Sequence, residues 1–306
     1  MPNPPTALLF PGQGAQSDTM LDELSRFEQF QAPYALASDT LGYDLLAELR
    51  KGTTSIHTNL VSSLMTVLAS VVSLDILRQS DATAASVMGV AGYSVGQWVA
   101  LYAARAISLV QLIRIVHRRA AMMDECAARN PGSMIAVIGI GESTLENCCA
   151  GIRSRGLFVA IANYNAVGQY TLSMETRAVS VVMQEVQALK PIKCIQLQAA
   201  GPWHSQMMSP AADALAEFLQ GEAFRPTAIP TIDNTTGNFL PMEVDSCRRR
   251  LADQVSQPVR WSNGIETLVT QGAARFIEVG YGNMLTKFGF FINRNVQHMT
   301  FHTSLA

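Results

Sequence analysis

Gly92-Tyr93-Ser94-Val95-Gly96 is the stretch that decides the fold of this chain. An apolar, β-prone run precedes it at 85–91, and a helix-favouring run follows it at 97–104. A Gly-x-Ser-x-Gly sequence between a strand and a helix predicts a nucleophile elbow, a turn so tight that only glycine fits beside the serine. Isolated matches to this pattern also arise by chance, but the flanking strand and helix argue against that here. Ser94 is therefore the leading candidate for a nucleophile.

Strands and helices alternate through the first part of the chain. Residues 6–10 form a short apolar strand that ends in a Gly- and Pro-rich loop at 11–16, whose main-chain N–H groups can point into a cleft. This loop lacks both the Gly-x-Gly-x-x-Gly spacing and the Gly-Lys-Ser/Thr ending of phosphate-binding loops. Helices are predicted at 20–24, 31–41, 60–79, 95–106 and 109–129. The alternation predicts an α/β fold whose core is an α/β-hydrolase-like parallel sheet covered by helices.

The pattern changes between residues 130 and 199. Strands are predicted at 133–140, 157–163, 169–174 and 192–197, with helices at 142–155 and 176–189. The order β-α-β-β-α-β is that of a ferredoxin-like unit. Helices at 208–220 and 244–254 and strands near 229–234 and 274–279 follow. We therefore expect a large α/β-hydrolase-like body from 1–129 and 200–306, with a ferredoxin-like subdomain inserted at 130–199.

Bulk composition fits a soluble α/β protein. Hydrophobic residues make up 48% and charged residues 15% of the 306 residues, and the net charge of -2 does not point to nucleic acid or an anionic membrane. The five cysteines are odd in number and lack metal-ligand spacing, so we expect reduced thiols. The N-terminus does not resemble a signal peptide, and the apolar segment 60–77 is interrupted by serines and Asp75. We expect a cytoplasmic protein with a buried helix at 60–77.

A serine nucleophile needs a base to accept its proton, and His204 is the best placed of five histidines. It follows Gly201-Pro202-Trp203 in a turn-like segment where the chain re-enters the large body, a position that favours a cleft. His117 is expected to pack or lie at the surface, and His298 and His302 to fray near the C-terminus. A carboxylate partner is hard to find. Asp233 is possible, and a Ser-His dyad held by a backbone carbonyl is equally compatible.

Arg119 lies 25 positions after Ser94 on a helix with an apolar face. A cation beside such a face either extends to water or meets a buried anion, and extension to water is the default for an arginine. Near an acylated serine, the same side chain would form a bidentate clamp for a free carboxylate.

Together these motifs resemble the malonyl-CoA:acyl-carrier-protein transacylases from Leu8 to about Thr286. The resemblance rests on ordered motifs at compatible spacings, which are Phe10-Pro11-Gly12-Gln13-Gly14-Ala15-Gln16, Gly92-Tyr93-Ser94-Val95-Gly96, Arg119, His204 and Gln254-Val255-Ser256-Gln257-Pro258-Val259-Arg260-Trp261. It implies that Ser94 is acylated and that His204 acts as base and then acid. It also implies that the main-chain carbonyl of Gln254 orients His204 and that the N–H groups of Gln13 and Val95 form the oxyanion hole.

The same resemblance implies that Arg119 binds the malonyl carboxylate and that the reaction is ping-pong. The acceptor would be the thiol of an acyl carrier protein, on phosphopantetheine or a dephospho-CoA-type group, with malonyl-CoA as donor. No tightly bound cofactor or metal, nucleic acid or membrane is implied, and a monomer is expected. For carrier docking, the basic candidates are Arg248-Arg249-Arg250, Lys287 and Arg294, although a solvated helix face explains the arginine run equally well.

Three positions depart from the resemblance, with Tyr93, Gln97 and Ser63 standing where the family commonly has His, Glu and Gln. The Gly-Tyr-Ser-Val-Gly form resembles the branch that serves malonate decarboxylase, through its transacylase (epsilon) subunit. The alternatives are a transacylase of fatty acid or polyketide synthesis, an α/β-type acyl-CoA thioesterase or hydrolase, and a non-catalytic scaffold. A scaffold predicts a decayed constellation, which these residues do not show.

Overall fold

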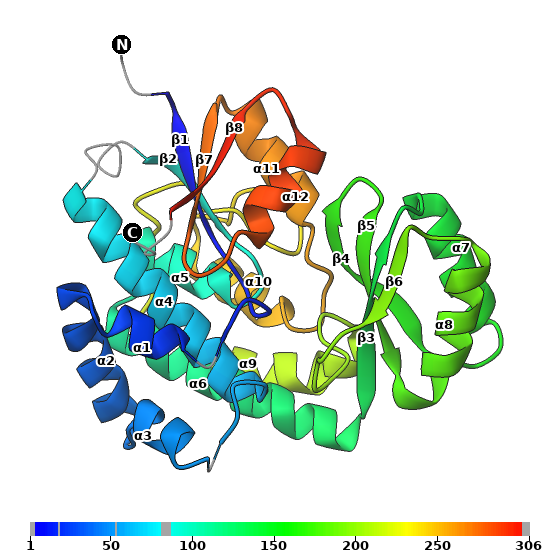
Figure 1. Cartoon of the computed structure of the whole chain (residues 1–306), viewed down its shortest axis with the longest axis horizontal. Helices are drawn as coiled ribbons and strands as arrows, with labels where there is room; N and C mark the ends of the chain where they lie inside the picture. Colours follow the sequence, from blue (N-terminus) through cyan, green and yellow to red (C-terminus); the bar gives the residue numbers. More distant parts are fainter. Residues whose placement is uncertain (1–3, 18, 53, 81–86, 302–306) are drawn as a thin grey trace.

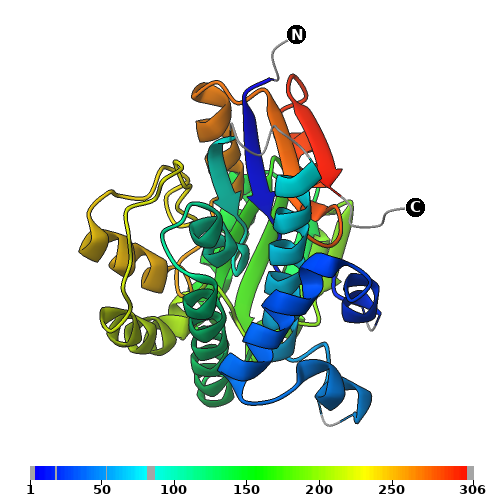
Figure 2. The same ribbon diagram turned by 90° about the vertical axis from the view of Figure 1, so that its left-hand side faces the viewer.

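A parallel sheet of four strands, in the order β2-β1-β7-β8, forms the centre of the larger part of the molecule (Figure 1). Its strands are β1 (Thr6–Phe10), β2 (Val87–Gly92), β7 (Arg275–Val279) and β8 (Gln297–Phe301). Figure 2 shows them side by side, from teal β2 through blue β1 and orange β7 to red β8. The structure is a computed structural model that describes residues 4–17, 19–52, 54–80 and 87–301. Parallel strands need crossover connections, and helices supply them here.

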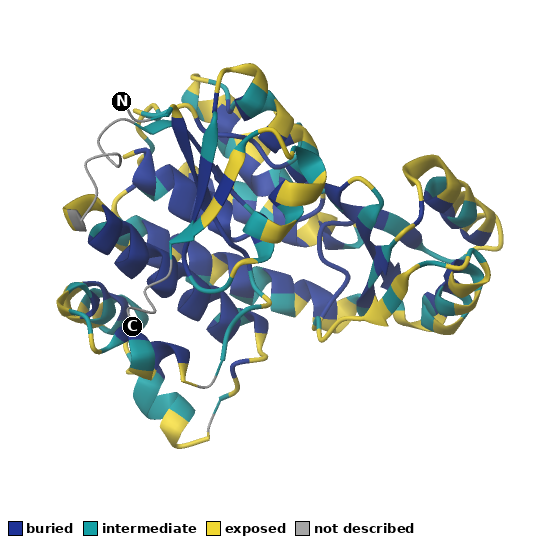
Figure 3. Cartoon of the chain, turned by 45° about the horizontal axis from the view of Figure 1, so that its top comes forward, coloured by how far each residue is buried: buried dark blue, intermediate teal, exposed yellow. Residues whose placement is uncertain are grey.

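Helices cover both faces of β1, β2 and β7, whereas the edge strand β8 is partly exposed. Successive side chains of a strand point to opposite faces of the sheet. On β1, Leu8 and Phe10 join the core that contains α4, α5 and α6, whereas Ala7 and Leu9 join a second core with α11 and α12. The helices of this part are α1 (Met20–Leu24), α2 (Glu28–Leu41), α3 (Leu45–Arg50), α4 (Asn59–Ser80), α5 (Gly96–Ala103), α6 (Leu109–Arg129), α9 (Ser209–Gln220), α10 (Val244–Asp253), α11 (Trp261–Thr270) and α12 (Met284–Ile292). In Figure 3 the strands and central helices are mostly buried.

Helix α4 is the one described helix long and apolar enough to cross a membrane by length and composition. In the fold, 89% of its apolar window is buried inside the molecule. Its apolar surface therefore fills the core, as predicted for residues 60–77.

A second sheet lies in a smaller part, which we call the small lobe (residues 132–196); the rest is the large lobe. Its antiparallel strands run in the order β4-β5-β3-β6. The elements are β3 (Gly132–Ile138), α7 (Glu142–Arg153), β4 (Val159–Ala166), β5 (Gln169–Glu175), α8 (Val179–Ala188) and β6 (Lys193–Gln196). Ile135 and Leu172 face the core shared with α7 and α8, whereas Ala136 and Thr171 face a cavity between the lobes. One face of this sheet therefore packs on the helices of the small lobe, and the other face lines the cavity.

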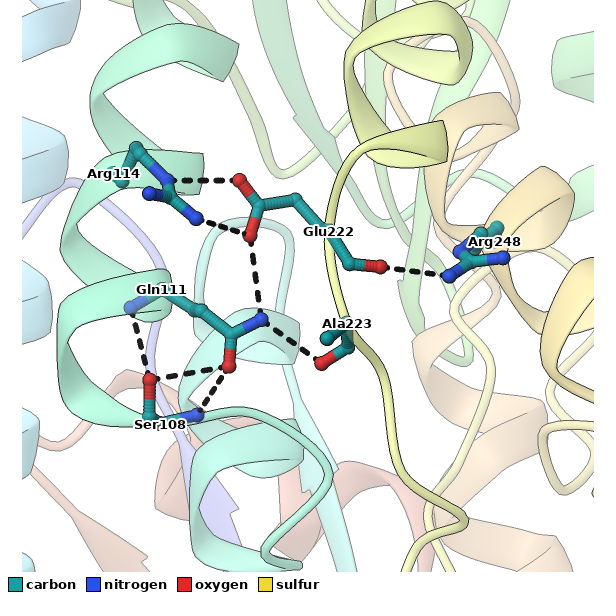
Figure 4. Close-up of polar contacts among 6 residues, drawn as sticks. All are labelled: Ser108, Gln111, Arg114, Glu222, Ala223 and Arg248. Atoms are coloured by element: carbon teal, nitrogen blue, oxygen red, sulfur yellow. Dashed lines mark hydrogen bonds and ion pairs between the residues drawn. The ribbon is translucent and has the colours of Figure 1, made fainter.

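Helix α6, which carries Arg119, is fixed by polar contacts at its N-terminal end (Figure 4). Ser108 and Gln111 form a capping box, so each satisfies a free N–H group of the other. One turn on, Arg114 Nε and Nη2 donate to the two carboxylate oxygens of buried Glu222 at 2.8 and 2.7 Å. Glu222 lies just after α9, and Arg248 donates to its main-chain carbonyl at 2.7 Å. The contacts tie α6 to the chain between α9 and α10.

The structure differs from the sequence predictions mainly in the C-terminal third, and also at α3. The expected strand near 229–234 forms only isolated bridges, through Thr231 and Ile232. Helices α3, α11 and α12 and strand β8 were not predicted. His298 does not fray but lies in β8, buried and stacked on Phe276, because β8 pairs with β7. The first residues of the predicted strand at 85–91 and the predicted candidate His302 lie outside the described residues.

Candidate active site

The turn after β2 places Ser94 at the start of α5. Ser94 has a φ of 52°, in the left-handed region that side chains rarely adopt. A Cβ at Gly92 would stand 2.0 Å from the Gly96 carbonyl oxygen, and one at Gly96 would stand 2.2 Å from the Phe10 carbonyl oxygen. Both glycines are therefore required by close backbone packing, as the elbow motif predicts.

His204 lies directly against the serine, with its Nε2 2.8 Å from Ser94 Oγ. Its Nδ1 is 2.8 Å from the main-chain carbonyl oxygen of Gln254, which can only accept a hydrogen bond. Nδ1 therefore carries the proton, and the bare Nε2 faces the hydroxyl. Asp233 is not a third member, because its carboxylate accepts hydrogen bonds from Thr235 and Thr236. The geometry is a Ser-His dyad oriented by a backbone carbonyl.

The environment keeps the imidazole of His204 neutral. Burial, followed by the positive charge of Arg119, lowers the pKa of His204 to about 4, although its hydrogen bond to the Gln254 carbonyl opposes the shift. A neutral imidazole at neutral pH can accept the Ser94 proton directly.

Arg119 does not extend to water, so the default interpretation was wrong for this residue. Its side chain is only 1% exposed, because α6 packs its apolar face under the elbow. Nη2 lies 3.4 Å from Ser94 Oγ and 3.2 Å from Gln254 Oε1, while Nε has no hydrogen-bond partner among the described residues. Burial lowers the pKa of Arg119 to about 10, so the guanidinium remains charged at neutral pH. It is a buried cation with spare donors beside the nucleophile.

A buried amide network, which the sequence reasoning missed, supports the elbow. Asn234 Oδ1 accepts from the Ser94 N–H at 2.8 Å, and its Nδ2 donates to the Gly92 carbonyl at 2.6 Å. Gln254 Nε2 donates to the Ser94 carbonyl at 2.6 Å and to Gln97 Oε1 at 3.0 Å. An asparagine at the end of a predicted strand was the one available signal for this network.

The loop after β1 brings Gln13 beside the elbow. Its Nε2 donates to Ser62 Oγ at 2.7 Å and to Ser63 Oγ at 2.8 Å, at the start of α4. Among the described residues, no hydrogen bond engages the main-chain N–H of either Gln13 or Val95. Both donors are therefore free to bind an anion that develops next to Ser94.

A cavity of about 550 Å³ leads from the surface to Ser94 between the two lobes. The residues that line it are Gln13, Gly14, Gln16, His57, Asn59, Ser62, Tyr93, Ser94, Met134, Ala136, Val137, Ile138, Asn163, Asn165, Gln169, Tyr170, Thr171, Gln196, Leu197, Gln198, Ala199, Ala200, Trp203, His204, Met284 and Phe288. No Asp, Glu, Lys or Arg belongs to this lining. Eight of the residues that line the cavity are Asn or Gln, whose side-chain amides can form hydrogen bonds with an uncharged polar ligand.

Other sequence candidates lie away from this cavity. Arg248 pairs with Asp245, and Arg249 lies within ion-pair distance of Asp253 and Asp213, so most of the predicted basic run is neutralised within the fold. Lys287 and Arg294 are exposed on or next to α12. The five cysteines are unpaired, and the described residues include no cluster of three or more His, Cys, Asp or Glu suited to a metal.

This geometry belongs to a known class of enzyme. The chain matches the acyl transferase domain over residues 7–294, so it belongs to that family and is an acyltransferase. It is 30% identical over 294 residues to malonyl CoA-acyl carrier protein transacylase of Bacillus subtilis (strain 168), covering 95% of this chain and 91% of that protein. The corresponding transacylase of Escherichia coli (strain K12) is 30% identical over 282 residues, covering 92% and 90%.

Solved structures agree with this assignment. A chain of PlMCAT:AntF, a type II PKS acyl-carrier protein in complex with its malonyl-transacylase, superimposes with a TM-score of 0.88 and 29% identity. The match covers 97% of this chain and 94% of that one. The mixed α/β fold predicted from the sequence is confirmed as that of malonyltransferases.

Proposed function

We propose that this acyltransferase moves a malonyl group from malonyl-CoA, through a malonyl-Ser94 intermediate, to the thiol of an acyl carrier protein. The observation that carries the proposal is a buried arginine with spare donors 3.4 Å from a serine that is already paired with a neutral histidine. The names of the relatives support the substrate and the carrier. The β-α-β-β-α-β small lobe supports its interpretation as a ferredoxin-like insert in an α/β-hydrolase-like body.

In the first half-reaction, Ser94 Oγ attacks the thioester carbon while His204 Nε2 accepts the hydroxyl proton. The carbonyl oxygen becomes an oxyanion, for which the free N–H groups of Gln13 and Val95 are the donors. As the C–S bond breaks, His204 returns the proton to the departing CoA thiolate. The carrier thiol then repeats these steps in reverse order and regenerates the serine.

Arg119 would distinguish the malonyl group from uncharged acyl groups. A guanidinium presents parallel N–H donors that match the two oxygens of a carboxylate. Arg119 does not line the cavity, but its Nη2 lies 3.4 Å from the Oγ of Ser94, which does. Since no carboxylate is among its hydrogen-bond partners in the described residues, a substrate carboxylate would be its counter-ion. A bound carboxylate would also offset the positive charge of Arg119, which after burial is the second cause that lowers the pKa of His204.

Two biological contexts are compatible with this chemistry. Fatty acid or polyketide synthesis has the support of the relatives' names, including a polyketide biosynthesis protein of Burkholderia thailandensis that is 35% identical over 286 residues. That match spans 92% of this chain and 23% of that protein. Tyr93 in the elbow favours malonate decarboxylase as a second candidate. In either context we expect a cytoplasmic monomer that uses no tightly bound cofactor.

Intact-mass measurement after brief exposure to malonyl-CoA tests the proposal. Wild-type protein should gain one malonyl adduct, and Ser94→Ala should gain none. Adding a phosphopantetheinylated carrier should remove the adduct and malonylate the carrier, and a carrier of the dephospho-CoA type tests the second context. Free malonate released at the same rate with and without carrier would instead show a hydrolase.

A further inference from the structure

Tyr93 is the elbow residue that the chemistry above leaves without a role. Its side chain reaches across from the large lobe, and its hydroxyl donates to Asn165 Oδ1 on β4 of the small lobe at 2.7 Å. Asn165 is buried, and its Nδ2 donates in turn to Thr171 Oγ1 on β5 at 3.3 Å. This hydrogen bond joins the elbow (residues 92–96) to the small lobe.

The Tyr93 ring is fixed by the large lobe on several sides. It makes an edge contact with Trp261 of α11, with centroids 5.6 Å apart, and a tilted contact with Phe288 of α12 at 6.2 Å. A Cβ at Gly12 would stand 2.9 Å from Tyr93 Cδ1, so the ring lies directly on the loop that carries Gln13. The hydroxyl is thus presented to Asn165 by a ring that has little freedom to move.

Further contacts between the lobes lie immediately beside Asn165 on β4. The Tyr164 N–H donates to the Val259 carbonyl at 2.9 Å, and the Val259 N–H donates to the Ala162 carbonyl at 2.8 Å. These main-chain bonds join β4 to the segment before α11. The bond from Tyr93 to Asn165 lies next to them and joins β4 to the elbow beside the nucleophile, where both residues line the cavity.

We propose that Tyr93 is a positioning residue that ties the nucleophile elbow to the small lobe and so sets the width of the cavity through which a thioester reaches Ser94. This proposal rests on the proposed function, since it concerns the entry of a long acyl donor. A thioester arm that touches both walls of the cavity needs them at a set separation. A small serine reagent that reacts only at Ser94 does not.

Tyr93→Phe tests the tie because it removes the hydroxyl and keeps every ring contact. A hydrogen bond of this kind contributes about 0.5–1.5 kcal/mol net, so kcat/KM for malonyl-CoA should fall about two- to tenfold. The rate at which a small organophosphorus fluoridate modifies Ser94 should not change. Tyr34→Phe, which removes a hydroxyl that donates to Asp44 in the large lobe and lies outside the cavity lining, should leave both rates unaltered.

A double-mutant cycle with Asn165→Ala separates the tie from general damage. If one bond is responsible, adding Tyr93→Phe to Asn165→Ala should lower kcat/KM no further than Asn165→Ala alone. Multiplicative losses, or equal losses for malonyl-CoA and the small reagent, would overturn the proposal. Thermal unfolding of each variant reports folding, and Asn165→Ala breaks the same bond if Tyr93→Phe folds poorly.

The outcomes also distinguish this inference from the proposed function. A wild-type protein that forms no malonyl-Ser94 adduct refutes the function, whatever the variants do. A wild-type protein that transfers malonyl normally, with Tyr93→Phe equal to it on both reagents, refutes the tie alone.

Discussion

Replacing Arg119 by alanine should change which acyl group the enzyme selects. The guanidinium is 1% exposed and keeps an unpartnered Nε, so it can supply charge-assisted hydrogen bonds to a malonyl carboxylate without first breaking strong contacts. Arg119→Ala would leave that carboxylate buried without a partner. Breaking a buried ion pair from one side costs about 3–5 kcal/mol.

At about 1.36 kcal/mol for each factor of ten, this cost predicts a loss of roughly 10²- to 10⁴-fold in kcat/KM for malonyl-CoA. The acetyl group has no carboxylate, so acetyl-CoA should react with Arg119→Ala at least as well as with the wild type. The ratio of the two kcat/KM values is the quantity to measure, because it cancels any general disturbance of Ser94 or Gln254, which Arg119 also contacts.

The assay is single-turnover acylation of Ser94 followed by intact mass, with both thioesters on each variant. Arg118→Ala is the matched control, since Arg118 is the adjacent residue of α6 but is exposed and lies over the Phe218 ring. It should leave the malonyl-to-acetyl ratio unchanged. Equal losses for malonyl and acetyl transfer in Arg119→Ala would show that the arginine is not a carboxylate clamp.

Four further outcomes follow from the buried groups. Because the His204 pKa is lowered to about 4, kcat/KM for acylation should stay level as pH falls through 6.5 and decline only near pH 4–5 in a pH-rate profile. In the unfolded chain His204 takes up a proton below about pH 6.5, whereas in the folded protein it stays neutral until about pH 4. The free energy of unfolding, measured by urea titration, should therefore fall as the pH is lowered from 6.5 to 4. Arg114→Met removes the main ion-pair partner of buried Glu222 and should lower the free energy of unfolding. Because Arg114 is half exposed, the expected loss is about 1–2 kcal/mol. The rate of acylation should not change. Gln97→Glu should move the acid limb of the profile to higher pH, by adding a carboxylate to the network of Gln254.

The parts of the site that the sequence predicts are those encoded by local rules. The elbow is one, because the Gly-x-Ser-x-Gly pattern between a strand and a helix marks the turn locally, and Gly92 packs against the Gly96 carbonyl. The position of His204 is another, since a Gly-Pro turn signals a loop. The packing of Gly96 on the Phe10 carbonyl of β1 is a distant contact that the pattern does not reveal.

The missed features depend on contacts that are distant in sequence. Asn234 lies 140 positions from Ser94, and nothing in its neighbours marks it as the acceptor of the Ser94 N–H. The burial of Arg119 is similar, because the same apolar helix face suits an arginine that extends to water and one that is covered. Helices α11 and α12 lack strong start signals, since no side-chain cap is formed at either N-terminus.

The departures from the family pattern show how the fold keeps a chemical group when a position changes. Ser63 stands where the family commonly has glutamine, and the Gln13 side chain reaches its hydroxyl at 2.8 Å, so the contact between the loop and α4 remains. Gln97, in place of glutamate, keeps an oxygen that accepts from Gln254 Nε2 but removes the negative charge. Among the described residues, Arg119 has no carboxylate among its hydrogen-bond partners. Burial, followed by the charge of Arg119, lowers the pKa of His204, and the same charge would pair with an acyl group that carries a carboxylate.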